Sequence, residues 1–121
     1  CRNCSDINFN ALSCYKRVYD EYYRSSWRRH LSFALTLNDF ILLVRNKCYY
    51  CSTENSNCLS LKNGRKLYYN GIDRIDNDIG YQPTNCVSCC KQCNFSKRDL
   101  SVGSFLSWAK NVVNNTKERS C

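Results

Sequence analysis

The feature that most constrains this chain is a pair of C-x2-C motifs that flank a segment rich in Asp and Asn. The first motif is Cys48 to Cys51, the second is Cys90 to Cys93, and residues 71–77 between them read GIDRIDN. A C-x2-C turn presents two thiolates, so two such turns supply the four ligands of a tetrahedral zinc site. The sequence therefore predicts one structural Zn2+ bound by Cys48, Cys51, Cys90 and Cys93.

Length and cysteine usage agree with this prediction. The chain has 121 residues and 11 cysteines, which is enough for one domain with a modest core that a structural metal would help to fold. Such a count fits either a secreted disulfide scaffold or zinc binding in a reducing compartment. The odd number and the short spacings favour zinc.

The other cysteines leave one alternative open. Cys86 and Cys89 form a further C-x2-C motif, and with Cys1 and Cys4 they could build a second zinc site. Cys89 could also replace Cys90 as a ligand of the first site. Three cysteines have no evident partner and are expected to be free thiols: Cys14, Cys58 and Cys121.

The charge of the chain indicates a polyanionic partner. Its formal net charge is +8 and its pI is about 9.0, a balance typical of proteins that bind nucleic acid, although a merely soluble basic protein remains an alternative. No apolar run approaches the ~18 residues of a membrane span, so no membrane partner is expected. We expect an intracellular location, and the absence of Met admits processing for an organelle.

Apolar spacing and capping signals predict the helices. Residues 8–29 have aromatic residues at helical spacing, and the arginines near their end suit the helix dipole or could meet phosphate. Thr36 is a plausible N-cap for a second helix, with Asp39 in its first turn, that ends before Cys48. The other expected elements follow in order: a loop at 52–64, a strand at 65–69, a hairpin turn at Asn70-Gly71 into a second strand, a loop at 76–83, a short extended segment at 85–88, a helix from Asn94 and a helix at 101–114.

The combined pattern resembles the HNH endonucleases, also called ββα-metal nucleases, and is most similar to small phage and organelle-type members with zinc knuckles. The resemblance is carried by GIDRIDN at 71–77, Gly80-Tyr81, Asn85, CCKQCN at 89–94 and Lys97. It continues upstream through 35–40 and the first C-x2-C motif, and downstream through 104–108. It implies an α+β fold with a small zinc-stabilised ββα-metal core and flanking helices.

The resemblance also implies how the chain is divided. Residues 1–121 would form a single HNH-like domain, with N-terminal helices at 8–47, the zinc-bound core at 48–100, and a C-terminal helix and tail at 101–121.

The family motif assigns roles to four residues. Asp73 and Asn94 match the two ligands of a divalent ion, Mg2+ or Mn2+, and Asn85 matches the central Asn that orients the general base. Arg74 stands where the base, a histidine, is expected. Because arginine stays protonated, it cannot take a proton from water. Arg74 is therefore expected to contact phosphate.

Several readings of this departure stay open. The proton could be taken by Asp76 or by His30, the one histidine of the chain, or the bound ion itself could activate water. Asp73, Asn85 and Asn94 could also be ordinary turn and cap residues, since these side chains often satisfy free backbone N–H groups.

Two functions follow from the resemblance. The first is a divalent-metal-dependent endonuclease that hydrolyses DNA phosphodiester bonds. The second is an HNH-like module that has lost catalysis and serves as a zinc-stabilised nucleic-acid-binding or structural subunit, with RNA or protein neighbours, in an assembly such as an organellar ribosome. In either case the basic residues near the motif are the expected nucleic-acid contacts: Arg65, Lys66, Arg74, Lys91, Lys97 and Arg98.

Overall fold

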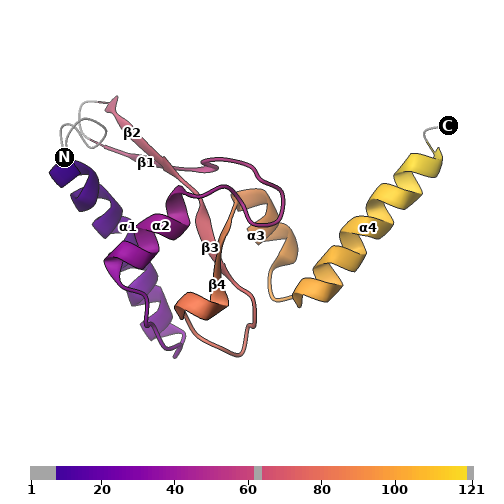
Figure 1. Cartoon of the computed structure of the whole chain (residues 1–121), viewed down its shortest axis with the longest axis horizontal. Helices are drawn as coiled ribbons and strands as arrows, with labels where there is room; N and C mark the ends of the chain where they lie inside the picture. Colours follow the sequence, from indigo (N-terminus) through magenta and orange to yellow (C-terminus); the bar gives the residue numbers. More distant parts are fainter. Residues whose placement is uncertain (1–7, 62–63, 120–121) are drawn as a thin grey trace.

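The computed structural model describes residues 8–61 and 64–119 and shows an α+β architecture (Figure 1). Two α-helices come first along the described chain, the strands of two small sheets follow, and two more α-helices come last. Their bounds are α1 Asn8–Arg28, α2 Leu37–Arg45, β1 Asn57–Ser60, β2 Lys66–Tyr69, β3 Gly71–Arg74, the short 3-10 helix η2 Pro83–Asn85, β4 Cys86–Cys89, α3 Lys91–Lys97 and α4 Val102–Arg119.

The first two helices form where capping and periodicity predict them. The Thr36 hydroxyl accepts a hydrogen bond from the Asp39 amide at 3.1 Å, and the Thr36 amide donates to the Asp39 carboxylate at 3.1 Å. This reciprocal capping satisfies two N–H groups and fixes the start of α2. Phe40 and Val44 from α2 then pack with Val18 of α1 in the buried core.

The strands pair differently from the prediction. A hairpin turn was expected at Asn70-Gly71, but β2 pairs back with β1, which lies inside the expected loop, and β3 pairs with β4. Asn70 is buried, and its amide nitrogen donates to the carbonyls of Asn46 at 2.9 Å and Thr53 at 3.0 Å. It therefore anchors the chain where it passes from one sheet to the other.

The second sheet and the helix after it form a ββα unit. Strands β3 and β4 are antiparallel, with Asp73 opposite Val87. Helix α3 begins at Lys91 rather than at Asn94, because Cys90 is its N-cap and the Cys90 Sγ accepts a hydrogen bond from the Cys93 amide at 3.3 Å. This arrangement places strand β3 beside helix α3 (Figure 1).

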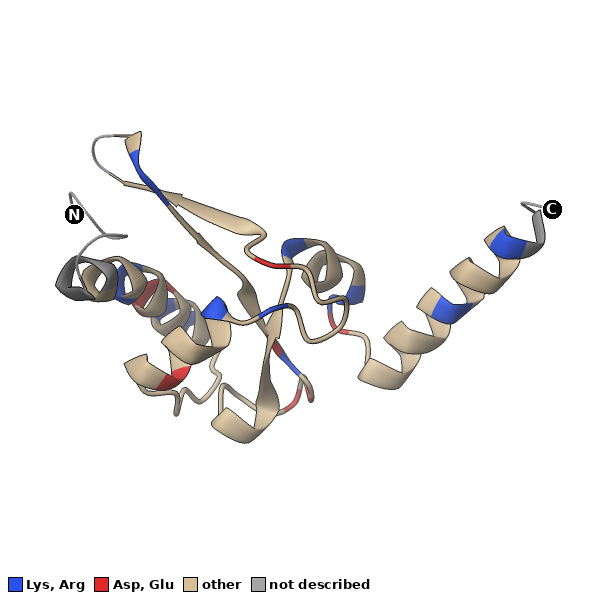
Figure 2. Cartoon of the chain, turned by 45° about the horizontal axis from the view of Figure 1, so that its top comes forward, with Lys and Arg blue, Asp and Glu red and all other residues tan. Residues whose placement is uncertain are grey.

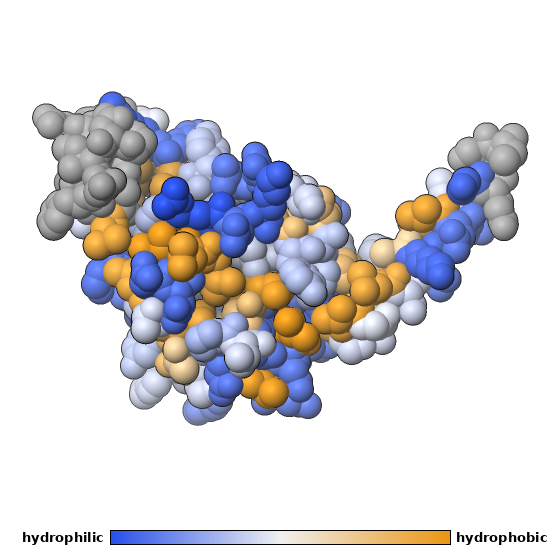
Figure 3. Space-filling model, in the orientation of Figure 1, coloured by the Kyte–Doolittle hydropathy of each residue, from blue (hydrophilic) through white to orange (hydrophobic). Residues whose placement is uncertain are grey.

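Helix α4 is longer than predicted and extends away from the body (Figure 1). Phe105 anchors it by packing edge-on against Tyr50 in the second buried cluster. Beyond this anchor, apolar side chains of α4 are exposed, and Figure 3 shows the apolar surface at its base and along it. No described helix has the length and apolar character needed to cross a membrane.

Candidate functional site

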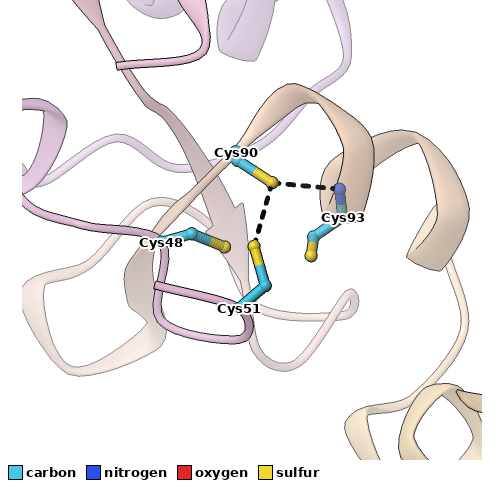
Figure 4. Close-up of side chains that lie close together, drawn as sticks. All are labelled: Cys48, Cys51, Cys90 and Cys93. Carbon is cyan, nitrogen blue, oxygen red and sulfur yellow. Dashed lines mark hydrogen bonds between the residues drawn. The ribbon is translucent and has the colours of Figure 1, made fainter. Parts of the chain in front are cut away.

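The four predicted zinc ligands lie together. Cys48 and Cys51 come from the turn after α2, and Cys90 and Cys93 come from the start of α3 (Figure 4). All four sulfur atoms lie within 4.8 Å of one another, and the Cys51 and Cys90 sulfurs are 3.5 Å apart. Tetrahedral Zn2+ with bonds near ~2.3 Å sets sulfur–sulfur distances of about 3.8 Å. The donor set and its spacing therefore fit zinc.

The environment of these four thiols favours a bound cation. Burial raises the pKa of Cys90 and of Cys93, whereas hydrogen bonding to Thr53 lowers the pKa of Cys51 to about 6. Four thiolates cannot share this space without a compensating charge, which a bound metal ion supplies.

The remaining cysteines divide among several environments. Cys86 and Cys89 are three residues apart on β4, so their side chains point to opposite faces and do not combine as the proposed second site requires. Cys1, Cys4 and Cys121 lie outside the described residues. Cys14 is disulfide-bonded, so its expectation as a free thiol is wrong, while Cys58 is a free, exposed cysteine.

A pocket of about 350 Å³ opens beside the ββα unit. Helix α1, strand β3, the loop after β3 and helix α3 all contribute to it. Its lining residues are Glu21, Tyr22, Ser25, Arg29, Ile72, Asp73, Arg74, Asn77, Tyr81, Asn94 and Arg98. The predicted residues Asp73, Arg74 and Asn94 thus meet in one pocket.

Asp73 is the only one of these whose charge is buried, with 5 % of its surface exposed. Its carboxylate accepts a hydrogen bond from the Tyr50 hydroxyl at 2.6 Å and lies 3.3 Å from the Lys97 ammonium. Tyr50 stands between the two cysteines of the first C-x2-C motif. One hydroxyl therefore links the cysteine cluster directly to the pocket carboxylate.

Arg74 and Asn85 organise the loop after β3. The Arg74 Nη1 donates to the carbonyls of Asn77 at 2.7 Å and Ile79 at 2.9 Å. The buried Asn85 amide nitrogen donates to three loop carbonyls, and its oxygen accepts from the Asp76 amide at 2.9 Å. Asn85 thus shapes one wall of the pocket without lining it.

The pocket residues fit a hydrated divalent ion and not an all-protein cage. Among the described residues, the cysteine cluster is the one group of three or more His, Cys, Asp or Glu side chains close enough to hold a metal. Asp73 and Asn94 would supply two oxygen ligands. Mg2+ is commonly held by one or two carboxylates, with water and substrate phosphate completing its shell.

Neither alternative proton acceptor reaches this pocket. The Asp76 carboxylate is exposed, lines a different depression and accepts from the Asp78 amide at 2.9 Å. His30 follows α1 and lies with Trp27 and Leu31 in another surface depression. No histidine of the described chain lines the pocket that contains Asp73.

The predicted nucleic-acid contacts separate into three groups. Arg74 and Arg98 line the pocket, whereas Arg65, Lys66 and Lys91 are exposed residues outside its lining. Figure 2 shows that Lys and Arg are spread over several helices and strands of the chain. Lys97 is fully buried against Asp73, so its predicted contact with nucleic acid does not agree with its position.

Two pocket features escaped sequence reasoning. Arg29 was one of several arginines near the end of α1, and only the fold aims it at this pocket, where it lies 3.4 Å from the Tyr81 hydroxyl. The contact from Tyr50 to Asp73 also depends on folding. The one available signal was that Tyr50 lies inside a predicted metal-binding turn.

The solved structure of the rare-cutting HNH restriction endonuclease PacI is similar to this chain, with a TM-score of 0.61. The match covers 88 % of this chain and 81 % of that one at 18 % sequence identity. The chain has an HNH-type fold. The fold class expected from the sequence is therefore confirmed, and the resemblance to HNH endonucleases is supported at the level of structure.

Sequence comparison finds a viral relative. The chain is 35 % identical over 111 residues to the uncharacterized protein R423 of Acanthamoeba polyphaga mimivirus. The match covers 92 % of this chain but spans only 19 % of that protein. No family model matches the sequence.

Proposed function

We propose that this chain is a divalent-metal-dependent endonuclease that hydrolyses DNA phosphodiester bonds. The observation that carries the proposal is the convergence of Asp73, Arg74 and Asn94 on one pocket of the ββα unit, where Arg29 and Arg98 add positive charge. Clefts lined with cationic side chains concentrate polyanions and stabilise phosphate charge. PacI is an HNH restriction endonuclease that perturbs DNA, which supports DNA as the substrate class here.

The pocket residues would have different roles in phosphodiester hydrolysis. Asp73 and Asn94 would bind Mg2+ or Mn2+, which would stabilise the negative charge that develops on the phosphate. Arg29 and Arg98 are exposed and would neutralise phosphates of the strand. Arg74 keeps one nitrogen on the loop carbonyls, so its guanidinium would hold the pocket wall while facing the substrate.

This proposal predicts nicking of supercoiled plasmid by zinc-loaded protein when Mg2+ or Mn2+ is added, and none when the added divalent ion is left out. Arg29→Ala should weaken DNA binding and reduce its salt dependence, because one phosphate contact is lost. Arg17→Ala is the matched control, since Arg17 is an exposed arginine of the same helix outside the pocket lining. If the two variants weaken DNA binding equally, a role of the pocket in DNA binding is contradicted.

A second function is favoured by one observation. The Asp73 carboxylate already has a cationic partner in Lys97 and a hydroxyl donor in Tyr50, and no histidine lines the pocket in the described chain. These contacts would suit a scaffold retained as a nucleic-acid-binding or structural module, including one that binds RNA. Salt-sensitive binding of nucleic acid without any metal-dependent cleavage would favour this second function.

A further inference from the structure

Lys97 is the most unusual charged residue of the described chain because none of its surface is exposed. Lysine is almost never fully buried unless it is paired. Its ammonium lies 3.3 Å from each oxygen of Asp73. The pair is therefore centred on both carboxylate oxygens rather than on one.

The two sides of Asp73 have different environments. Lys97 is not among the residues that line the pocket, so its ammonium approaches the carboxylate from the protein interior. Tyr50 also contacts the carboxylate, through its hydroxyl, at 2.6 Å. Asp73 still lines the pocket with 5 % of its surface exposed, so an incoming cation would have to approach the carboxylate from the pocket side.

We propose that Lys97 is a built-in counter-ion that positions Asp73 and weakens the pocket's affinity for a divalent ion until a phosphate is present. The inference rests on the proposed function only in placing that ion at Asp73. The Asp73–Lys97 pair has no net charge, so an ion that enters alone gains little from Coulomb attraction. A phosphate in the pocket supplies the missing negative charge and completes the ion's ligands.

This role makes Lys97 a positioning residue that couples ion binding to substrate binding. Without Lys97, the buried Asp73 carboxylate has no cationic partner, and a divalent ion becomes its natural replacement. Removal of one partner from a buried pair is strongly destabilising because the other charge is left uncompensated. The same variant should therefore bind ions more tightly and depend on them for stability.

The test measures Mn2+ binding by electron paramagnetic resonance without DNA, in zinc-loaded wild type, Lys97→Met and Lys91→Met. Lys97→Met should bind Mn2+ on the order of tenfold more tightly than wild type, because a positive charge next to the ligand is gone. Lys91 is the matched control, since it is an exposed lysine of the same helix outside the pocket lining. Lys91→Met should bind Mn2+ as wild type does.

Stability provides the second readout. Added Mn2+ should raise the unfolding temperature of Lys97→Met by more than it raises that of wild type. If Lys97→Met does not fold, Lys97→Gln removes the charge while keeping a hydrogen-bond donor, and the same tighter binding is expected. The double variant Asp73→Asn with Lys97→Met has a neutral pair and should lose Mn2+ binding while retaining its zinc.

Unchanged or weaker Mn2+ binding in folded Lys97→Met or Lys97→Gln would overturn the counter-ion role, whether or not the wild type cuts DNA. Tighter Mn2+ binding by Lys97→Met, together with no DNA cleavage by wild type, would support the counter-ion role and contradict the proposed nuclease activity. A third readout tests the coupling itself: a short DNA duplex should tighten Mn2+ binding by wild type more than by Lys97→Met.

Discussion

The cysteine cluster and the Asp73 pocket lie next to each other, yet they differ in how many protein ligands they offer to a metal ion. The cluster brings together four protein ligands, which fills a tetrahedral metal shell. In the pocket, only the Asp73 carboxylate and the Asn94 amide are predicted ion ligands, and the remaining positions around such an ion would be taken by water or phosphate. A complete ligand set stabilises a fold, whereas an incomplete set leaves room for substrate.

Helix α3 carries residues of both regions. Cys93 belongs to the cysteine cluster, Asn94 lines the pocket, and Lys97 pairs with Asp73. Tyr50 makes a second connection, from the cysteine turn to the Asp73 carboxylate. The comparison therefore predicts that loss of the cluster disrupts the pocket, while changes in the pocket leave the cluster intact.

The largest expected effect comes from breaking the cluster. Cys93→Ser should abolish zinc binding and cooperative unfolding, because a structural zinc site contributes on the order of 10 kcal/mol to folding. Zinc content and circular dichroism measure the result. Cys58→Ser is the matched control, since Cys58 is exposed and outside the cluster. A folded, cooperatively melting Cys93→Ser protein would contradict the structural role.

A smaller effect is expected from the loop that forms a pocket wall. Asn85→Ala should lower the free energy of unfolding by about 3 kcal/mol, because it leaves partners of a buried amide unsatisfied. Urea denaturation measures this loss, and zinc content should stay unchanged. Gln82→Ala is the control, because Gln82 is exposed and its side chain makes no capping bond. Equal stability of the two variants would contradict the assignment of Asn85 as the loop's anchor.

The smallest effect concerns the link between the regions. Tyr50→Phe should cost about 2 kcal/mol, since it removes a hydrogen bond to a charged carboxylate. Its neighbour Tyr49 is largely exposed and is the natural control. A double-mutant cycle of Tyr50→Phe with Asp73→Asn should show coupling between the two side chains. Independent effects would mean that the hydroxyl does not connect the regions energetically.

Local signals made part of this structure predictable. The Thr36 and Asp39 capping pair and the two C-x2-C turns each involve residues close in sequence, so spacing alone identifies them. The resemblance to HNH endonucleases placed Asp73, Arg74 and Asn94 in one motif, and the structure places them in one pocket. The catalytic roles of these residues stay predictions.

Features that depend on distant contacts were not predictable. Asn70-Gly71 has the composition of a hairpin turn, yet Asn70 is recruited by the carbonyls of Asn46 and Thr53, and the strands find other partners. In the sequence, nothing distinguishes Lys97 from a solvent-exposed lysine. It is buried against Asp73 only because α3 packs on β3 in the folded protein. Strand pairing and burial are set by tertiary packing, which propensity does not encode.

The central claim is that the Asp73 pocket acts on phosphodiester bonds while the cysteine cluster holds the fold. Its most direct test is plasmid cleavage with Mn2+ by wild type and by Asp73→Asn with Lys97→Met, which keeps a neutral buried pair in place of Asp73–Lys97. We expect the double variant to be folded and zinc-loaded with cleavage lost, and the wild type to cut. Equal cleavage by both proteins, or none by folded wild type, would contradict the claim.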